Sequence, residues 1–341
     1  MAAAPAARDG SVGMTSERFL VTGALGCIGS WAVKRLVDEG VPVTTYDLPG
    51  DPYRMRLIMD DDAIAKVQFV QGDITDQTRF EEVVRENDIT HMLHLAALQV
   101  PFVRANPVLG AQVNVVGSAI VFETARKLAD RIAGLAYASS IAVYGSANLY
   151  PPGPLADDAP LMPVTLYGVT KEANEGWAAI YWQDYAVSSV GLRPFFVYGP
   201  GRDQGVSSTP TKAMAAAAVG RPYHVSFGGT DTYQHADDVA RVFIDAARTM
   251  PEGAPVYNLG GTVAAMEDVV AAIERAAPES AGTITFNSEP LFTPDGVEGK
   301  AIAALLGPVT WRSLDDGVRD TIDVFRTAAS AGRLDADRAI S

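Results

Sequence analysis

The chain has 341 residues, 48% of them hydrophobic, which is enough to bury the core of one large domain or of two ordinary ones. Its net charge of −14 and the absence of a basic cluster argue against a nucleic-acid partner. A single cysteine excludes an intrachain disulfide, and the sequence has no run of about 18 apolar residues that would span a membrane, so we expect a cytoplasmic protein. The four histidines lack the spacing of metal ligands, so we expect no metal site.

Residues 1–15 are rich in small residues and predict a disordered extension. After them, strand and helix patterns alternate at short intervals, as is typical of a parallel sheet covered by helices on both faces. The first expected helix begins after the glycine-rich turn at 23–29 and ends at Gly40, and two longer ones cover 106–128 and 167–185. The expected strands of this half are 19–22, 43–47, 67–73, 89–97, 135–140 and 188–194.

The second half is less regular, with a loop-like break at 199–205. We predict an α/β fold, in which residues 16–195 form a Rossmann-type doubly wound parallel sheet. Residues 196–341 are expected to form a smaller C-terminal substrate domain, from which about 232–260 return to the first domain. The expected elements of this half are helices at 210–218, 237–249, 266–277 and 315–329 and strands at 256–259 and 283–286.

The glycine-rich turn joins the first strand to the first helix, which is where a dinucleotide fingerprint has physical meaning. Gly23 permits the tight turn, Gly26 lets the backbone approach a pyrophosphate, and Gly29 lets helix and strand pack closely. The free N–H groups at the start of the helix, around Cys27 and Ile28, favour a phosphate. The sequence therefore predicts a cofactor site in this turn.

Asp47 ends the second strand, where a carboxylate accepts hydrogen bonds from both adenosine ribose hydroxyls and repels a 2′-phosphate. This favours NAD over NADP. Asp73 ends the third strand and is a candidate for binding the adenine amino group, with a helix cap as the alternative. Cys27 is either a small packing residue or a redox sensor whose pKa the helix lowers.

Tyr167 and Lys171 lie four residues apart, so they share one face of the expected helix. A nearby ammonium favours the phenolate, which lets Tyr167 act as an acid or base closer to neutral pH. Ser140 follows the fifth strand, where a hydroxyl points into the ligand crevice or simply caps a turn. Asn114 is a poor helix former inside a long helix, and it would anchor a water or backbone group beside this pair.

Together these motifs resemble the extended short-chain dehydrogenase/reductase family, specifically its NAD-dependent epimerase/dehydratase branch, from Glu17 onward. The resemblance implies that Tyr167 is the acid/base, that Lys171 is its partner, and that Ser140 orients the reacting oxygen. It also adds cofactor-binding candidates, namely Ile74, Leu95, Ala96 and Ala97. The motifs occur in family order at 22–29, 47, 72–74, 94–97, 114, 140, 167–171, 192–194 and 198–200, with weaker matches at 235–239 and 257–260.

The chain also departs from the family pattern at several positions. Ile141 and Ala142 stand where the family's dehydratases carry Asp-Glu, so we do not expect water elimination. Phe196 stands where enzymes acting on nucleotide-sugars usually carry an Asn, and Thr230 stands where they carry an Arg. The loss of two phosphate-binding groups predicts a smaller substrate, namely a free sugar, a sugar acid or a polyol.

The polar segment 201–208 lies where substrate loops occur, and its side chains either bind hydroxyls or a carboxylate or are merely solvated. The motif spacing favours Ser140 over Ser139 as the catalytic hydroxyl, because Ser140 stands four residues before Tyr144. The candidate substrate-binding residues are Gln99, Ser139, Ser140, Phe196, Arg202, Gln204 and His235.

We therefore expect an NAD-dependent oxidoreductase that oxidises a secondary alcohol of a small carbohydrate-like substrate. The alternatives are an NAD-dependent epimerase of sugars or nucleotide-sugars, and a non-catalytic NAD-sensing protein on the same fold. The resemblance further implies a homodimer in which helices 106–128 and 167–185 pair across a two-fold axis. The apolar residues available for core and interface are Val113, Val116, Ile120, Trp177, Ile180 and Tyr181.

Overall fold

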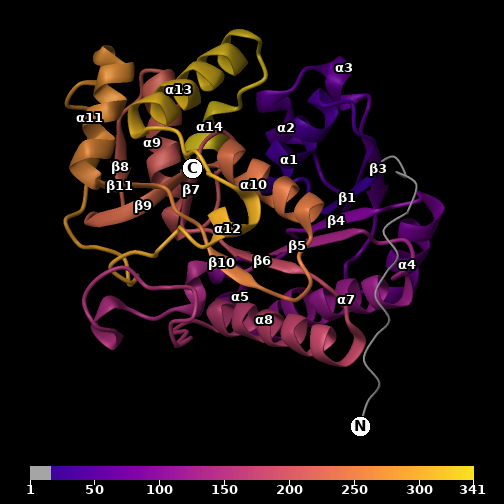
Figure 1. Ribbon diagram of the computed structural model, residues 1–341. Coiled ribbons are helices and arrows are strands. Elements are labelled where there is room, and N and C mark those ends of the chain that lie inside the picture. Colours follow the sequence, from indigo (N-terminus) through magenta and orange to yellow (C-terminus); the bar gives the residue numbers. More distant parts are fainter. Residues whose placement is uncertain (1–16) are drawn as a thin grey trace.

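A seven-stranded parallel sheet forms the centre of the protein, in the order β10-β6-β5-β4-β1-β2-β3 (Figure 1). The computed structural model describes residues 17–341, so the extension expected at 1–15 lies outside the described residues. The chain runs outward from β1 to β3 and then returns to β4 on the other side of β1. The strands are β1 (Phe19–Thr22), β2 (Val43–Asp47), β3 (Gln68–Gln71), β4 (His91–His94), β5 (Gly134–Ala138), β6 (Val190–Arg193) and β10 (Val256–Asn258).

This reversal between β1 and β4 confirms the predicted Rossmann-type fold, and it opens a crevice at the carboxyl ends of these two strands. Doubly wound sheets bind their ligands in such crevices. The functional residues expected after β1, β4 and β5 are therefore brought to one edge of the sheet.

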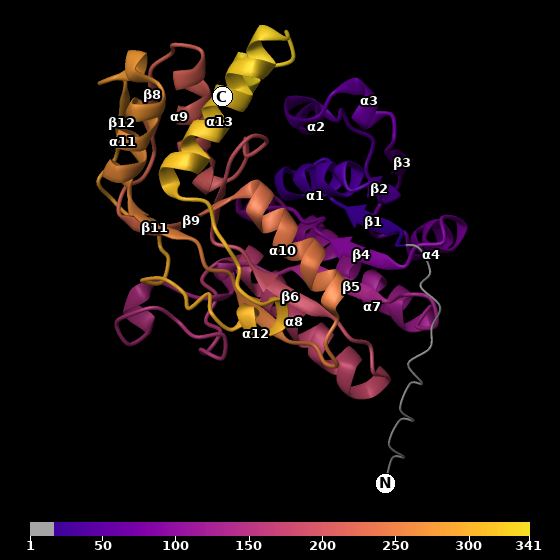
Figure 2. The same cartoon turned by 45° about the horizontal axis from the view of Figure 1, so that its top comes forward.

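Helices cover both faces of the sheet, and each face has its own apolar core (Figures 1 and 2). The first face carries α1 and α10, which pack against each other, and the second carries α4, α7 and α8. Burial on both faces is why the strands are so apolar in sequence. The helices of this part are α1 (Cys27–Asp38), α2 (Tyr53–Ile58), α3 (Asp61–Ile64), α4 (Gln77–Glu86), α5 (Val100–Ala105), α8 (Leu166–Tyr185), α10 (Ala236–Thr249) and α12 (Ile302–Leu306).

The helix expected at 106–128 is present, with a π-helical stretch in its middle. It comprises α6 (Pro107–Ala111), the π-helical residues Gln112–Val116 and α7 (Gly117–Lys127). By length and mean hydropathy alone, Pro107–Lys127 would be able to cross a membrane, but half of its most apolar window is buried inside the fold. The burial identifies it as a core helix that covers the sheet.

The C-terminal part forms a smaller unit around two short sheets, in the orders β11-β9-β7 and β12-β8. Of the segment expected to return to the first domain, α10 and β10 do so, whereas β9 pairs with β7 and β11 in the smaller unit. The elements are β7 (Phe196–Tyr198), β8 (Tyr223–Val225), β9 (Thr230–His235), β11 (Thr262–Ala265), β12 (Ile284–Phe286), α9 (Thr209–Ala218), α11 (Met266–Ala276), α13 (Leu314–Ser330) and α14 (Ala336–Ile340).

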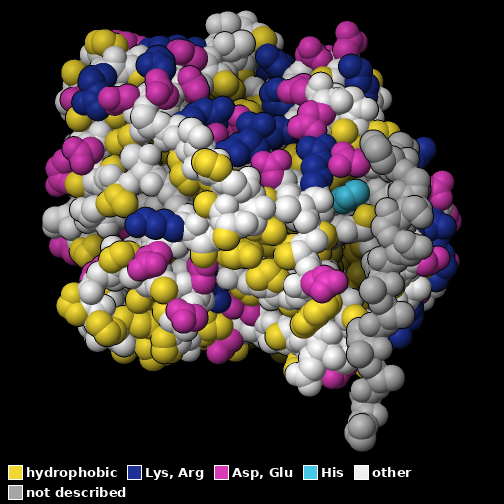
Figure 3. All heavy atoms as spheres, in the orientation of Figure 1, with side chains coloured by type: hydrophobic (Ala, Val, Ile, Leu, Met, Phe, Trp, Pro, Cys, Tyr) yellow, Lys and Arg dark blue, Asp and Glu magenta, His cyan; other side chains and the backbone are white. Residues whose placement is uncertain are grey.

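The surface seen in Figure 3 carries charged side chains of both signs over its upper half, where α13 and α14 approach α2. Arg338 pairs with Asp51 across this junction, whereas Arg221 and Asp337 pair within the smaller unit. Such exposed pairs contribute little stability individually. The pair of Arg338 with Asp51 does show that the C-terminal segment bridges the two parts of the molecule.

Candidate active site

The glycine-rich turn leaves no room for side chains at two of its positions. Gly23 has φ +69°, and a β-carbon there would lie 2.7 Å from the backbone nitrogen of Ala96. A β-carbon at Gly29 would lie 2.2 Å from the carbonyl oxygen of Gly23. The turn thus packs directly on residues Leu95 and Ala96 after β4, which are among the expected cofactor contacts.

Helix α1 begins at this turn with its N–H groups uncapped by any side chain. Gly26 is the N-cap and has no side chain to offer, and the first turn of the helix contains no acidic residue. The exposed N–H groups and the positive end of the helix dipole suit a pyrophosphate. The local structure therefore fits the phosphates of a dinucleotide.

Asp47 lies beside the turn, at the end of β2. Its carboxylate accepts hydrogen bonds from the backbone nitrogens of Ala24, at 3.0 Å, and Leu25, at 3.4 Å. Burial raises the pKa of Asp47 to about 7, and the two backbone hydrogen bonds oppose this shift. Within residues 17–341 no Lys or Arg forms an ion pair with it. This acceptor suits ribose hydroxyls and disfavours an added phosphate.

Asp73 and Cys27 behave less like ligand-binding groups. Asp73 is exposed, and its carboxylate accepts hydrogen bonds from the backbone and the hydroxyl of Thr75, which is a local turn. Ile74 next to it is buried against Gly117. Burial raises the pKa of Cys27 to about 12, so the thiol remains protonated and resembles a packing residue more than a redox sensor.

Ser140 and Tyr167 come together at the carboxyl edge of the sheet. Burial raises the pKa of Tyr167, while the nearby Ser140 hydroxyl and the charge of Arg202 lower it. The Ser140 oxygen accepts a hydrogen bond from the backbone of Ala142 at 3.1 Å, so it caps the turn. Its role toward a substrate in the crevice stays a prediction.

Lys171 is buried one helical turn from Tyr167 and directs its ammonium toward the sheet. Its Nζ donates to the carbonyl oxygen of Ala138 at 2.7 Å and lies 5.6 Å from the centre of the Tyr167 ring. Burial lowers the pKa of Lys171 to about 8, and the charge of Glu175 acts in the opposite direction. A positive charge at this place favours the phenolate form of Tyr167.

Asn114 lies within the π-helical stretch and binds backbone groups, one of the two roles expected for it. Its side-chain oxygen accepts from the backbone nitrogen of Leu98 at 2.7 Å, and its nitrogen donates to the Leu98 carbonyl at 3.0 Å. The same nitrogen donates to the hydroxyl of Thr170 at 3.1 Å. The wider turn of a π-helix is often found at functional sites, and here it directs the amide toward the segment after β4.

The sequence interpretation missed a buried ion pair beneath this centre. Glu175 accepts two hydrogen bonds from Arg193, at 2.8 and 2.7 Å, and a third from the Ser139 hydroxyl at 2.5 Å. Arg193 also donates to Tyr144 and to Asn258. The spacing was a usable signal, because 167, 171 and 175 follow one another on a single helix face. Ser139, a substrate candidate by sequence, has its hydroxyl engaged inside the protein.

The loop at 199–205 contacts both α1 and the segment that follows β4. The Trp31 indole donates to the carbonyl of Pro200 at 3.0 Å, which ties the loop to α1. A β-carbon at Gly205 would lie 2.3 Å from the Gln99 side-chain oxygen and 3.3 Å from Nη2 of Arg202. The structure therefore brings the substrate candidates Gln99 and Arg202 together, while Gln204 is exposed.

Phe196 and His235 lie inside the smaller unit. Phe196 is buried, and its ring contacts those of Phe227 and Tyr233. His235 is buried against Trp31, its Nδ1 lies 2.7 Å from the Arg312 guanidinium, and its pKa falls to about 3 because of burial. A neutral imidazole in this position is a weak partner for a substrate carboxylate.

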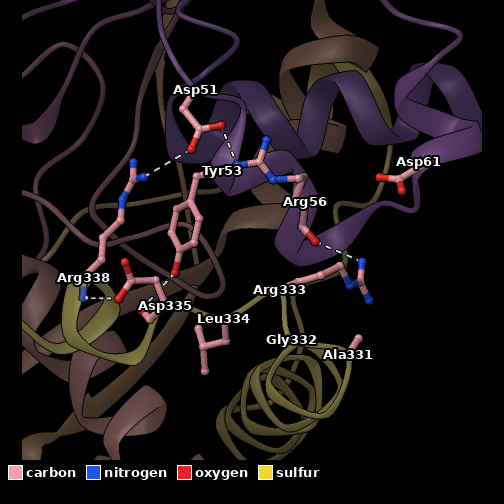
Figure 4. A pocket seen from close by; sticks show the side chains of 10 residues that line it. All are labelled: Asp51, Tyr53, Arg56, Asp61, Ala331, Gly332, Arg333, Leu334, Asp335 and Arg338. Atoms are coloured by element: carbon pink, nitrogen blue, oxygen red, sulfur yellow. Dashed lines mark hydrogen bonds and ion pairs between the residues drawn. The ribbon is translucent and has the colours of Figure 1, made fainter.

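An open cavity lies elsewhere, between α2 and the C-terminal segment (Figure 4). Two of its charged side chains are engaged with protein groups: Arg338 pairs with Asp51, and Arg333 donates to the backbone carbonyl of Arg56. None of the site residues expected from the sequence lines it. A smaller cavity on the other side of Tyr53 reaches Arg202.

Residues 19–260 match the model of the NAD dependent epimerase/dehydratase family. The chain is 30% identical to UDP-glucose 4-epimerase of Mycolicibacterium smegmatis, over 91% of this chain and 98% of that protein. It superimposes on UDP-glucose 4-epimerase of Thermus thermophilus, solved with NAD, with a TM-score of 0.76 and 27% identity, covering 91% of this chain and 99% of that one. L-threonine dehydrogenase of Clostridium difficile shares the fold at 20% identity, with a TM-score of 0.78 and coverage of 92% and 98%.

The chain belongs to the NAD-dependent epimerase/dehydratase family, and the resemblance inferred from its motifs is confirmed. It is an NAD-dependent enzyme of the extended short-chain dehydrogenase/reductase type. This excludes the purely NAD-sensing alternative.

Proposed function

We propose that this enzyme oxidises a secondary alcohol of a small carbohydrate-like substrate, with Ser140, Tyr167 and Lys171 as the catalytic residues. The observation that carries the proposal is the grouping of Ser140, Tyr167 and Lys171 at the edge of the sheet that holds the glycine-rich turn. Ser140 lowers the pKa of the Tyr167 phenol, and Nζ of Lys171 lies 5.6 Å from the centre of the Tyr167 ring. This arrangement places an acid/base, a hydroxyl donor and a cation around one point in the crevice.

Bound NAD would supply the acceptor for the hydrogen and two electrons that leave the carbinol carbon. Tyr167 would take the proton of the carbinol hydroxyl as the carbonyl forms, and Ser140 would donate a hydrogen bond to the same oxygen. Lys171 would favour the phenolate of Tyr167 and bind the cofactor ribose. The turn from Gly23 to Gly29, together with Asp47, would hold the remainder of the cofactor.

Two features support a substrate without a diphosphate. Phe196 offers no hydrogen-bond donor, and its ring is packed between Phe227 and Tyr233. Asp231, two residues before Tyr233 on β9, is buried, and its carboxylate accepts a hydrogen bond from Thr293 at 3.1 Å. Burial raises the pKa of Asp231 to about 6, so it is largely anionic at neutral pH and would repel a phosphate.

Epimerisation is the second candidate, and the similarity to UDP-glucose 4-epimerases favours it. In an epimerase the same centre would return the hydrogen to the other face of the carbonyl, with no net change of NAD. Dehydration has less support, because Ile141 and Ala142 provide no acid or base next to Ser140.

The test is a screen of free sugars, sugar acids and polyols for net NADH formation, which is monitored by ultraviolet absorbance. A dehydrogenase accumulates NADH, whereas an epimerase does not. In parallel, thermal unfolding with uridine and thymidine diphosphates tests the substrate size, since a ligand that binds only the folded protein raises the melting temperature. Stabilisation by a nucleoside diphosphate together with no NADH from any of the small substrates would reject the proposal.

A further inference from the structure

Arg202 belongs to a loop that is anchored to the glycine-rich turn through its neighbour Asp203. Its neighbour Asp203 accepts hydrogen bonds from the guanidinium of Arg54, at 2.9 and 2.6 Å. Arg54 in turn donates to the carbonyl of Leu25, inside the glycine-rich turn, at 2.8 Å. These contacts connect the loop that carries Arg202 to α2 and to the glycine-rich turn.

The Arg202 guanidinium lacks an anionic partner in the part of the chain that the structure describes. Its Nη2 donates to the Ser207 hydroxyl at 3.0 Å, whereas its Nε is buried and has no hydrogen-bond partner. Asp203 does not fill this role, because its carboxylate is bound by Arg54. Leaving a buried cationic N–H without an acceptor is costly, so such groups in native proteins usually await a ligand or serve a function.

The guanidinium of Arg202 lies beside Gln99, on the segment that follows β4. Nη2 of Arg202 and the side-chain oxygen of Gln99 both border the space beside Gly205, close to the end of β4. The charge of Arg202 lowers the pKa of both Cys27, in the glycine-rich turn, and the Tyr167 phenol, so the guanidinium acts on the cofactor turn and on the catalytic centre alike. An anion bound by Arg202 would therefore lie near the carbinol that Tyr167 deprotonates.

We propose that Arg202 binds a carboxylate of the substrate, so that the enzyme acts on sugar acids or similar hydroxy acids in preference to neutral sugars and polyols. The proposal rests on the proposed function and specifies its substrate class. A guanidinium presents parallel N–H donors that match the two oxygens of a carboxylate. The cofactor pyrophosphate is the other anion in the crevice, but it already has the uncapped start of α1 and the glycine-rich turn as its binding site.

The experiment measures binding of matched ligands to the enzyme loaded with NADH, so that no turnover is needed. The pairs are galacturonate with galactose and glucuronate with glucose. Binding of each ligand is measured by calorimetry and by thermal unfolding. In the wild type, at least one acid should bind at least 10-fold more tightly than its neutral partner. Arg202→Gln should weaken binding of that acid by about 10- to 100-fold, the scale of a hydrogen bond to a charged group. Arg202→Lys should retain part of the preference.

Arg85→Gln is the control, because it makes the same substitution at an exposed arginine in the last turn of α4, outside the site. NADH affinity should be similar in all the variants. Equal binding of acid and neutral ligands by the wild type would overturn the proposal, as would binding of neither. A collapse of NADH affinity in Arg202→Gln with acid binding retained would assign Arg202 to the cofactor instead. Carboxylate binding without any NADH formation from these acids would contradict the proposed oxidation and leave the role of Arg202 intact.

Discussion

The carboxylate of Glu175 and the guanidinium of Arg193 form a bidentate ion pair in the interior of the protein, directly beneath the catalytic centre. Glu175 lies one helical turn beyond Lys171, and Arg193 ends the neighbouring strand β6. Glu175 accepts a hydrogen bond from Ser139, and Arg193 donates one to Tyr144. The pair therefore contacts both ends of the segment that carries Ser140. It connects helix α8 to the sheet at the place where their relative position determines the site.

We predict that Glu175→Gln destabilises the protein by about 3–5 kcal/mol, because it leaves the buried guanidinium of Arg193 without its counter-charge. Urea unfolding monitored by circular dichroism measures the loss. Glu172→Gln, on the same helix but only half-buried, is the matched control and should change stability by less than about 1 kcal/mol. Equal effects of the two substitutions would contradict the prediction.

The same substitution should alter the pH dependence of turnover. The charge of Glu175 raises the pKa of Lys171, which burial brings down to about 8. Removing that charge lowers this pKa further, so Lys171 loses its proton at a less alkaline pH. The alkaline limb of the kcat profile should therefore move toward neutrality in Glu175→Gln, and remain in place in Glu172→Gln.

Cofactor selectivity should depend on pH through Asp47. With its pKa raised to about 7, this carboxyl is mostly ionised at pH 8 and mostly protonated at pH 6. Repulsion of a 2′-phosphate is therefore strong at the higher pH and weak at the lower one. The ratio of the Kd for NADP to the Kd for NAD, measured by calorimetry, should fall from pH 8 to pH 6.

Asp47→Asn should abolish most of this pH dependence and reduce the preference for NAD. Any pH dependence of the Kd ratio that remains in this variant comes from the titration of the 2′-phosphate itself. Asp130→Asn, at an exposed turn, serves as the control and should behave like the wild type. A selectivity ratio that does not respond to pH in the wild type would count against the role of Asp47.

Substitutions at the catalytic centre should differ in severity. Tyr167→Phe removes the acid/base and should reduce turnover by about 10²–10⁴-fold while NAD binding is preserved. Ser140→Ala deletes one donor to the reacting oxygen and should cost about 10²–10³-fold. Lys171→Ala should impair both turnover and NAD binding. Steady-state rates with an identified substrate, together with NAD titrations, test the order.

Tyr185→Phe is the control for this series, since Tyr185 is at the far end of the same helix and exposed. Near-normal turnover of Tyr167→Phe would refute the assignment of the chemistry to this centre.

The exposed face of α7 and α8 should form a homodimer interface. Of the apolar residues expected there, Ile120 and Tyr181 are buried in the protomer, whereas Val116, Trp177 and Ile180 are 48%, 41% and 49% exposed. An apolar surface of this kind is typical of a protein contact. Light scattering at micromolar concentration should give a dimer for the wild type and a monomer for Ile180→Arg. Val263→Arg, on an exposed strand of the smaller unit, should leave the dimer unchanged.

The predictions made from the sequence succeeded where the signal is local. The alternation of apolar strands and helices predicted the parallel sheet, and the glycine spacing identified the turn between β1 and α1. Helix α8 begins at Leu166 and ends at Tyr185, within one residue of the expected range. These features depend on the periodicity and steric demands of a few neighbouring residues, which any single sequence displays.

The short strands of the smaller unit were harder to recognise. β9 is the clearest case: Thr230–His235 is almost entirely polar by composition but buried between β7 and β11, in a sheet separate from the Rossmann one. This segment forms a strand because it pairs with β7 and β11, which are distant from it along the chain, and β-propensity depends strongly on such context.

The amino-acid sequence by itself determined the fold class, the cofactor turn and the pairing of Tyr167 with Lys171, because each follows from spacing along one element. Only the tertiary structure decided that Ser139 turns inward to Glu175, that Glu175 meets Arg193, and that the Nε of Arg202 is buried without a partner. Burial and hydrogen bonding of these groups depend on segments many residues apart, and the free energies involved arise only when folding removes water from between them.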